Sequence, residues 1–145
     1  MSADRPSIPA SEALTLLREG NRRYVQNVRS VESMVGHSRR GELTQQTPRA
    51  IILGCSDSRA PAEIVFDQGL GDLFVIRVAG NIVAPSQIGS VEFAAERFGT
   101  RLVVVMGHTQ CGAILTHYTS HLVVEALSGY KNGKVRQRGE LKRIY

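Results

Sequence analysis

The sequence predicts an α/β fold in which a parallel β-sheet is flanked by helices. Three short apolar runs, at residues 50–53, 73–78 and 102–106, have the length and composition of buried strands. They lack the polar alternation of half-exposed strands, so both faces of each strand require cover. Helical patterns precede, separate and follow these runs, which supplies that cover. A chain of 145 residues is long enough for one domain with its own core.

The first part of the chain predicts a helix followed by a loop. Residues 9–26 place apolar side chains at helical spacing, and Pro9 and Glu12 suit a first helical turn. Residues 27–48 are polar and interrupted by glycine and proline. We therefore expect a loop there, with room for one short helix.

The rest of the chain alternates strands with helices. A short helix is predicted at residues 61–67, between the first and second strands. An apolar stripe predicts a longer helix at residues 87–98, and a further helix begins near Gly112, after the third strand. Functional residues in open parallel sheets collect beyond the carboxyl ends of the strands.

The positive net charge resides at the C-terminus. The formal net charge is +5, and every lysine lies within residues 131–145. A nucleic-acid-binding domain spreads its basic residues over a folded face. We therefore interpret residues 1–130 as a single α/β domain and residues 131–145 as a basic, flexible tail, with no specific nucleic-acid partner. The alternative, nucleic-acid binding by this tail, predicts steeply salt-dependent binding.

The sequence predicts neither a membrane protein nor a secreted one. No apolar run approaches the roughly 18–20 residues of a membrane helix, and residues 1–13 have no apolar signal core. We therefore expect a cytoplasmic location and no membrane partner. Cys55 and Cys111 are then expected to be reduced, and available for chemistry or for metal binding.

Two of the predicted strands end in reactive residues. The first runs into Cys55–Arg59 (C-S-D-S-R), and the third runs into His108–Cys111 (H-T-Q-C). Adjacent parallel strands would bring these segments together. Two thiolates and one imidazole, from Cys55, His108 and Cys111, suit a tetrahedral zinc ion and leave its fourth position open. The alternative, small buried cysteines and a core histidine, does not explain two such motifs at two strand ends.

Asp57 and Arg59 follow Cys55 within one loop, and on an extended segment they can face the same side. A guanidinium beside a carboxylate lowers the pKa of the carboxylate and fixes its orientation. Such an aspartate can accept a hydrogen bond from a zinc-bound water, or it can ligate zinc itself. The alternative is an exposed ion pair that only ties the loop.

These residues carry a resemblance to a known family. The segments C-S-D-S-R, F-D-Q-G-L-G-D-L-F-V-I-R-V-A-G-N and G-H-T-Q-C-G-A resemble those of the bacterial β-class carbonic anhydrases, over about residues 12–114. The resemblance implies one zinc ion per chain, bound by Cys55, His108 and Cys111, a catalytic dyad of Asp57 and Arg59, and Gln68 in the substrate pocket, often from the neighbouring subunit.

The resemblance also implies a homodimer or a higher homo-oligomer. In the family, the N-terminal helix of one subunit packs on the other subunit. The apolar stripe of Leu16, Leu17 and Tyr24 would then be covered by a second copy of the chain.

The expected site and the resemblance imply the same reaction. Zinc lowers the pKa of bound water and provides hydroxide near neutral pH. Carbon dioxide is a small, neutral electrophile without a leaving group, so it suits this nucleophile. We therefore expect a carbonate dehydratase, a lyase that interconverts carbon dioxide and bicarbonate. The alternatives are a carbonyl sulfide or carbon disulfide hydrolase of the same fold, and a non-catalytic zinc-binding fragment.

The resemblance ends near Ile114, where the family continues with more helices and an edge strand. We expect this C-terminal part of the family fold to be missing, through truncation, frameshift or fusion. The open sheet edge and an uncovered apolar face of the sheet should then lower stability and activity. His117 and His121 are interpreted as a solvated helix face, because no carboxylate lies nearby to complete a metal site. In part of the family, a regulatory bicarbonate pocket uses a tryptophan together with an arginine that Arg77 could match. The chain has no Trp, so Arg77 is interpreted as structural.

Overall fold

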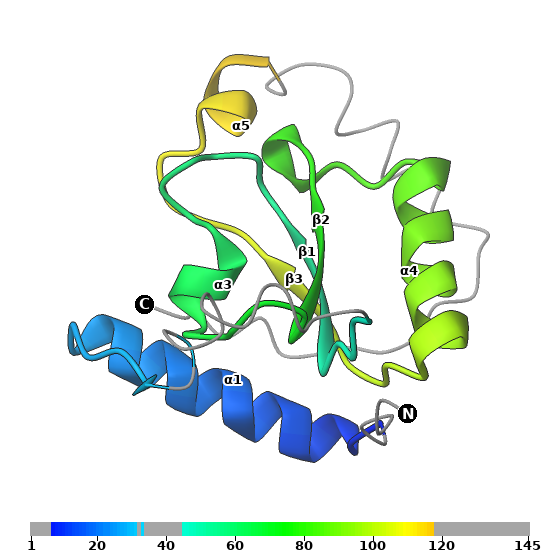
Figure 1. Ribbon diagram of the computed structural model, residues 1–145. Coiled ribbons are helices and arrows are strands. Elements are labelled where there is room, and N and C mark those ends of the chain that lie inside the picture. The colour runs from blue at the N-terminus through cyan, green and yellow to red at the C-terminus, as the bar shows by residue number, and fades with distance from the viewer. Residues whose placement is uncertain (1–6, 32, 34–44, 118–145) are drawn as a thin grey trace.

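The computed structural model describes residues 7–31, 33 and 45–117. It confirms the predicted fold class, a parallel three-stranded sheet with helices on both faces (Figure 1). The predicted tail at residues 131–145, together with His121, lies outside the described residues. Within the described part, no helix is long and apolar enough to cross a bilayer.

The observed elements follow the predicted order. They are α1 (Ala10–Val25), β1 (Ala50–Gly54), α3 (Ala62–Val65), β2 (Leu73–Arg77), the 3-10 helix η2 (Ala79–Asn81), α4 (Pro85–Phe98), β3 (Val103–Met106) and α5 (Gly112–His117). Helix α4 begins earlier than predicted, at Pro85, because the fixed φ of proline suits the first helical position. The Gln87 side chain accepts a hydrogen bond from the Ala84 N–H at 3.1 Å and so caps this end. Gly99 ends α4 with a left-handed φ of 64°.

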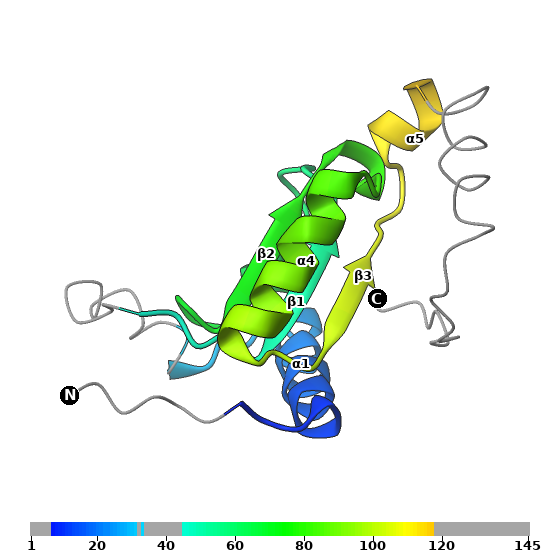
Figure 2. The same cartoon turned by 90° about the vertical axis from the view of Figure 1, so that its right-hand side faces the viewer.

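Strand β1 lies at the centre of the sheet, and the order is β2-β1-β3 with both pairings parallel. Gly54, the last residue of β1, pairs with Arg77 on one side and with Met106 on the other. The three strands therefore end at one level, and all three arrows point toward α5 (Figure 2). All five residues of β1 are buried, as expected for a central strand covered on both faces.

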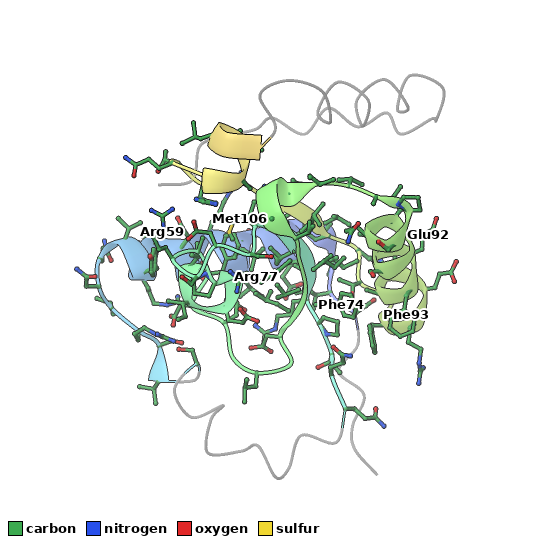
Figure 3. All side chains as sticks on the ribbon, turned by 90° about the horizontal axis from the view of Figure 1, so that it is seen from above. Arg59, Phe74, Arg77, Glu92, Phe93 and Met106 are labelled. Atoms are coloured by element: carbon green, nitrogen blue, oxygen red, sulfur yellow. The ribbon has the colours of Figure 1, made fainter. Side chains whose placement is uncertain are left out.

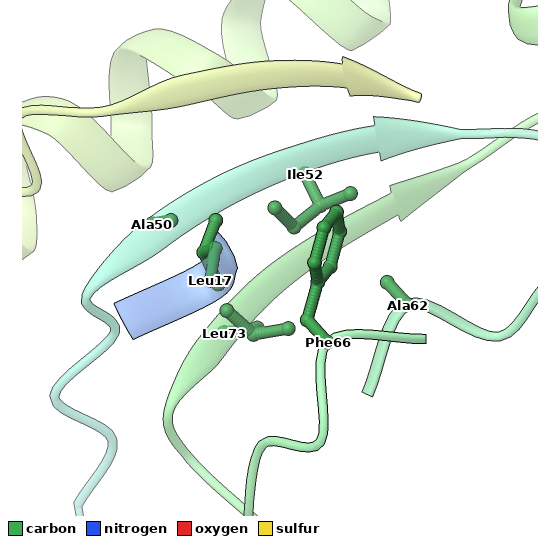
Figure 4. Packing of buried hydrophobic residues seen from close by; sticks show 6 residues of the cluster. All are labelled: Leu17, Ala50, Ile52, Ala62, Phe66 and Leu73. Carbon is green, nitrogen blue, oxygen red and sulfur yellow. The ribbon is translucent and has the colours of Figure 1, made fainter. Parts of the chain in front are cut away.

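Helices α1 and α3 cover one face of the sheet. The core on this face consists of Leu17, Ala50, Ile52, Ala62, Phe66 and Leu73 (Figure 4). Helix α1 approaches closely at Gly20, where a Cβ atom would collide with the carbonyl oxygen of Phe66. The expectation that a second subunit covers Leu17 is therefore wrong, because α1 packs Leu17 onto its own sheet. Leu16 is half-buried on the same helix, and Tyr24 is exposed.

Helix α4 covers the opposite face, but it covers only part of that face. Its core consists of Ile51, Leu53, Ile76 and Ala94, with Phe74, Val91 and Phe98 packed against them. On β3, the side chains on this face are Val103, which is 47% exposed, and Val105, which is 52% exposed. Cover on both faces thus holds for β1, whereas β3 has one uncovered apolar face in the described part of the chain, as expected for a sheet without the C-terminal part of the fold (Figure 2).

A buried carboxylate ties α1 to the connection between α3 and β2. The Asp67 side chain accepts hydrogen bonds from Arg23 Nε at 2.6 Å, from Ser33 Oγ at 2.6 Å and from the Ser30 N–H at 2.9 Å. Arg29 Nε lies 3.4 Å from the same carboxylate. Burial raises the pKa of Asp67, but the hydrogen bonds from Ser33, Arg23 and Ser30 outweigh it and lower this pKa to about 2.

Replacing this carboxylate should change how stability depends on pH. The folded pKa of Asp67 lies below the unfolded value of about 3.9, so its stabilisation is complete above about pH 4 and is lost as the pH falls toward 2. Asp67→Asn should lower the free energy of unfolding at pH 7 by about 1.5–3 kcal/mol, and should flatten its fall between pH 4 and 2. Urea unfolding across this range checks both, with the exposed Glu19→Gln as control. A pH profile identical to that of the wild type would contradict this role.

The two faces of β3 offer a second test. Val104 packs against the core beneath α1 and α3, whereas Val105 is exposed. Val104→Thr should cost about 1–3 kcal/mol because it buries a hydroxyl, while Val105→Thr should stay within about 0.5 kcal/mol and should reduce the binding of an apolar dye. Equal losses of stability would show that both faces are covered in solution.

Candidate metal centre

Three loops meet at the carboxyl edge of the sheet. The loop after β1 carries Cys55, the segment after β2 forms η2, and the loop after β3 carries His108. In a view onto this edge, Arg59, Arg77 and Met106 gather near α5, and Phe93 lies apart on α4 (Figure 3). Two of these loops are held together directly, since the Arg59 Nη2 donates to the Gln110 carbonyl at 3.2 Å.

Two thiols and an imidazole converge at this edge. The Sγ atoms of Cys55 and Cys111 lie 3.8 Å apart, and both cysteines are free and buried. A nitrogen of the His108 ring completes a group whose three ligand atoms lie within 4.8 Å of one another. Zinc–sulfur bonds of about 2.3 Å at tetrahedral angles place two sulfurs about 3.8 Å apart. The pair of thiols therefore already has the spacing that a tetrahedral zinc ion requires.

The orientation of His108 also fits a metal ligand. Its Nδ1 donates a hydrogen bond to the Thr109 carbonyl oxygen at 3.0 Å, which leaves Nε2 as the unprotonated nitrogen of a neutral ring. Nε2 is buried and has no hydrogen-bond partner. Metal-bound histidines generally have their second nitrogen fixed in this way. A buried acceptor without a partner is costly, and a metal ion at Nε2 would remove that cost.

The surroundings of Cys55 favour its thiolate form. The Gly80 N–H, from η2, points at its Sγ from 3.3 Å. Burial raises the pKa of the Cys55 thiol, but the neighbouring His108 side chain and the Gly80 and Asp57 backbones lower it to about 7. Because the thiolate is the metal-binding form, this site is prepared for a cation near neutral pH.

Asp57 lies beside the three candidate ligands and is held by Arg59. Arg59 Nε and its backbone N–H both donate to Oδ1 at 2.9 Å, and Nη2 donates to Oδ2 at 2.6 Å. These hydrogen bonds hold the pKa of the Asp57 carboxyl well below its usual range, and raise the pKa of the Arg59 guanidinium. Asp57 Oδ2 is 3.8 Å from His108 Nε2, so an ionised carboxylate borders the ligand cluster.

Comparison with known proteins identifies the family of this chain. A family model described as carbonic anhydrase matches residues 50–138. The chain belongs to the β-carbonic anhydrase family. The matched range runs beyond Ile114, near which the sequence alone predicts the resemblance to end. Carbonic anhydrase 2 of Mycobacterium tuberculosis is 43% identical over 109 residues, which are 75% of this chain and 53% of that protein. The carbonic anhydrase of Mycolicibacterium smegmatis is 46% identical over 99 residues, covering 68% of this chain and 48% of that protein.

Solved β-carbonic anhydrases share the fold. A tetrameric enzyme from Sordaria macrospora superposes with a TM-score of 0.53 at 24% identity, over 66% of this chain and 56% of that one. The enzyme CafA of Aspergillus fumigatus superposes with a TM-score of 0.50 at 29% identity, over 72% of this chain and 48% of that one. The expected β-carbonic anhydrase fold is thus confirmed, and the chain spans about half the length of the curated relatives it matches.

The structure brings together Cys55, His108, Cys111, Asp57 and Arg59 of this β-carbonic anhydrase domain, but it places Gln68 differently. Gln68 is buried in the connection between α3 and β2. Its Nε2 donates to the carbonyl oxygens of Phe66 and Asp67 at 2.9 and 3.3 Å, so its hydrogen bonds lie within its own loop.

Sequence analysis did not assign a role in the site to two residues that contact the ligand loop. The Gly80 N–H donates a hydrogen bond to the Cys55 sulfur, and Arg77 donates hydrogen bonds to backbone carbonyls of the same loop. The signal for Arg77 was present, because it is a charged residue at the carboxyl end of an otherwise apolar strand. The role of Gly80 depends on the path of the chain and leaves no pattern in the sequence.

Metal analysis should find one zinc ion per chain. Cys55→Ser should weaken zinc binding by more than the roughly 10–100-fold that loss of an outer hydrogen bond costs, because a ligand itself is removed. The Cys55→Ser, Cys111→Ser double variant should retain no stoichiometric zinc after dialysis against a chelator. Ser58→Ala, an exposed change in the same loop, serves as control. Full zinc occupancy in the double variant would overturn the ligand assignment.

Proposed function

We propose that this domain is a zinc-dependent carbonic anhydrase that interconverts carbon dioxide and bicarbonate in the cytoplasm. The observation that carries the proposal is the unpartnered His108 Nε2, which shares its small cluster with two thiols beside an ionised Asp57. Membership of the family supports it. A zinc ion bound by Cys55, His108 and Cys111 would supply water that ionises near neutral pH.

Asp57 is proposed to orient the attacking water. Arg59 keeps its carboxylate ionised, so across the neutral range the carboxylate acts only as a hydrogen-bond acceptor. A water that donates one hydrogen bond to this carboxylate has a lone pair free to face the carbon of carbon dioxide. Positioning of this kind converts the bimolecular encounter between water and carbon dioxide into a nearly unimolecular step.

Arg59 is proposed to keep Asp57 away from the metal. Its guanidinium and backbone N–H satisfy both carboxylate oxygens, so the carboxylate has less tendency to become a fourth ligand. The Arg59 side chain is 61% exposed, so solvent screens the charge attraction. The fork-to-fork geometry, which fixes direction as well as charge, is therefore the main contribution of this pair.

Self-association belongs to the same proposal. The exposed valines Val103 and Val105 and the exposed Phe93 leave apolar surface on the described domain, which a second copy could cover. Gln68 does not hydrogen-bond to the Cys55–Arg59 loop of its own chain, which fits the implied role of this glutamine in a neighbouring subunit's pocket. A homodimer or higher homo-oligomer would account both for the exposed apolar surface and for the position of Gln68.

The dyad can be tested separately from the metal. Asp57→Asn should retain zinc but should lower the kcat of carbon dioxide hydration roughly 10²–10⁴-fold, the range typical of general acid–base and positioning groups. Arg59→Ala should lose activity similarly, because the freed carboxylate can occupy the open metal position. Stopped-flow hydration with a pH indicator measures both, and Glu92→Gln on α4 is the charge-matched control.

Three outcomes would contradict the proposal in different ways. Wild-type activity in Asp57→Asn would remove the role of the carboxylate. Hydrolysis of carbonyl sulfide without hydration of carbon dioxide would change the substrate. A zinc-loaded wild-type chain with neither activity would be a non-catalytic zinc-binding fragment.

A further inference from the structure

The segment that leaves β2 contributes none of the three clustered ligand atoms, yet it contacts both ligand-bearing loops. Gly80 N–H meets the Cys55 sulfur at 3.3 Å. Asn81 Nδ2 donates to the Met106 carbonyl oxygen at 2.8 Å, at the end of the strand that leads to His108. The most extensive of these contacts comes from Arg77, the last residue of β2.

Arg77 makes two hydrogen bonds to the backbone of the ligand loop. Its Nε donates to the Cys55 carbonyl oxygen at 2.9 Å, and its Nη2 donates to the Asp57 carbonyl oxygen at 2.6 Å. These carbonyls belong to a metal-ligand candidate and to the aspartate of the dyad, with only Ser56 between them. One side chain thus fixes the backbone on both sides of Ser56.

The sheet register explains how Arg77 reaches this loop. Arg77 pairs with Gly54 across the β1–β2 ladder, and Gly54 directly precedes Cys55. The loop beyond Gly54 has left the ladder, so its carbonyls need other donors. The Asp57 carbonyl also accepts the Ala60 N–H at 3.1 Å, but the Cys55 carbonyl depends on Arg77 among the described contacts.

Two arginines therefore hold Asp57 from two directions. Arg59 holds the side chain and Arg77 holds the backbone. The first interaction sets where the carboxylate points, and the second sets where its Cα lies relative to Cys55. A planar guanidinium can donate to two acceptors at once in a fixed geometry, whereas the single ammonium of lysine is a point donor on a flexible stem.

We propose that Arg77 is a positioning residue that fixes the separation between the Cys55 thiolate and the Asp57 carboxylate through the backbone between them. Its effect on metal binding follows from the loop geometry alone, and its effect on turnover rests on the proposed function. The hydrogen bonds of Arg77 go to the two carbonyl oxygens and not to a candidate ligand atom or to the Asp57 carboxylate, so its influence passes through the backbone.

The test compares Arg77→Met and Arg77→Lys with Arg101→Met, which removes an exposed arginine that precedes β3 and is the matched control. Zinc affinity is measured by competition with a chelator, thermal melting is measured on the metal-free protein, and kcat and KM are measured for carbon dioxide hydration. Outer hydrogen bonds at metal sites are typically worth roughly 10–100-fold in affinity or activity.

Arg77→Met should bind zinc roughly 10–100-fold more weakly than the control. It should also lower kcat per bound zinc, with KM little changed. The melting temperature of its metal-free form should stay close to that of Arg101→Met. Arg77→Lys should recover part of the zinc affinity, because lysine can still donate to one carbonyl. Zinc affinity and kcat equal to those of Arg101→Met would overturn the proposal, as would a fall in melting temperature with no change in either. A wild-type chain that binds zinc without hydrating carbon dioxide would count against the proposed function, and the zinc affinities would still decide the role of Arg77.

Discussion

The pairing of β1 with a parallel neighbour on each side is the constraint on which the site depends. Because Gly54 is level with Arg77 and with Met106, the segments that follow the three strands leave the sheet at the same level. Cys55 then emerges beside the loop that carries His108 and Cys111, and Arg77 emerges on the other side. The ladder hydrogen bonds and the apolar layers on both faces of β1 hold this alignment, since a slip of one residue would turn Ile51 and Ile52 to the wrong faces.

Polar groups at the carboxyl edge each fix the orientation or the protonation state of one functional side chain. Thr109 fixes the tautomer of His108, Gly80 supports the thiolate of Cys55, and Arg59 keeps Asp57 ionised. Each of these contacts acts on a group that would otherwise be free to rotate or to change its protonation. Preorganisation of this kind means that a metal ion and its water would meet a site already set, so little rearrangement would be needed during the reaction.

Burial is uneven across the sheet. The face under α1 and α3 is closed, and the close approach at Gly20 together with the Asp67 carboxylate holds α1 in place. The opposite face is closed over β1 by α4, but Val103 and Val105 on β3 remain exposed in the described part of the chain. The ligand cluster lies at the strand ends and does not itself include these valines, so the chemistry of the site and the completeness of the sheet are separate properties of this chain.

The sequence by itself determined the fold class, the element order and the candidate ligands. Short β-branched runs without alternation require a sheet covered by helices, and cysteine and histidine at two strand ends point to a metal at the carboxyl edge. Only the tertiary structure decided which strands are neighbours, that α1 covers its own sheet, which side chains of β3 are exposed, and that Arg77 and Gly80 reach the ligand loop. The physical reason is that periodicity and residue type report local preference and chemical character. Backbone carbonyls, the Gly80 N–H and the faces of an edge strand acquire partners only when segments distant in the sequence pack together.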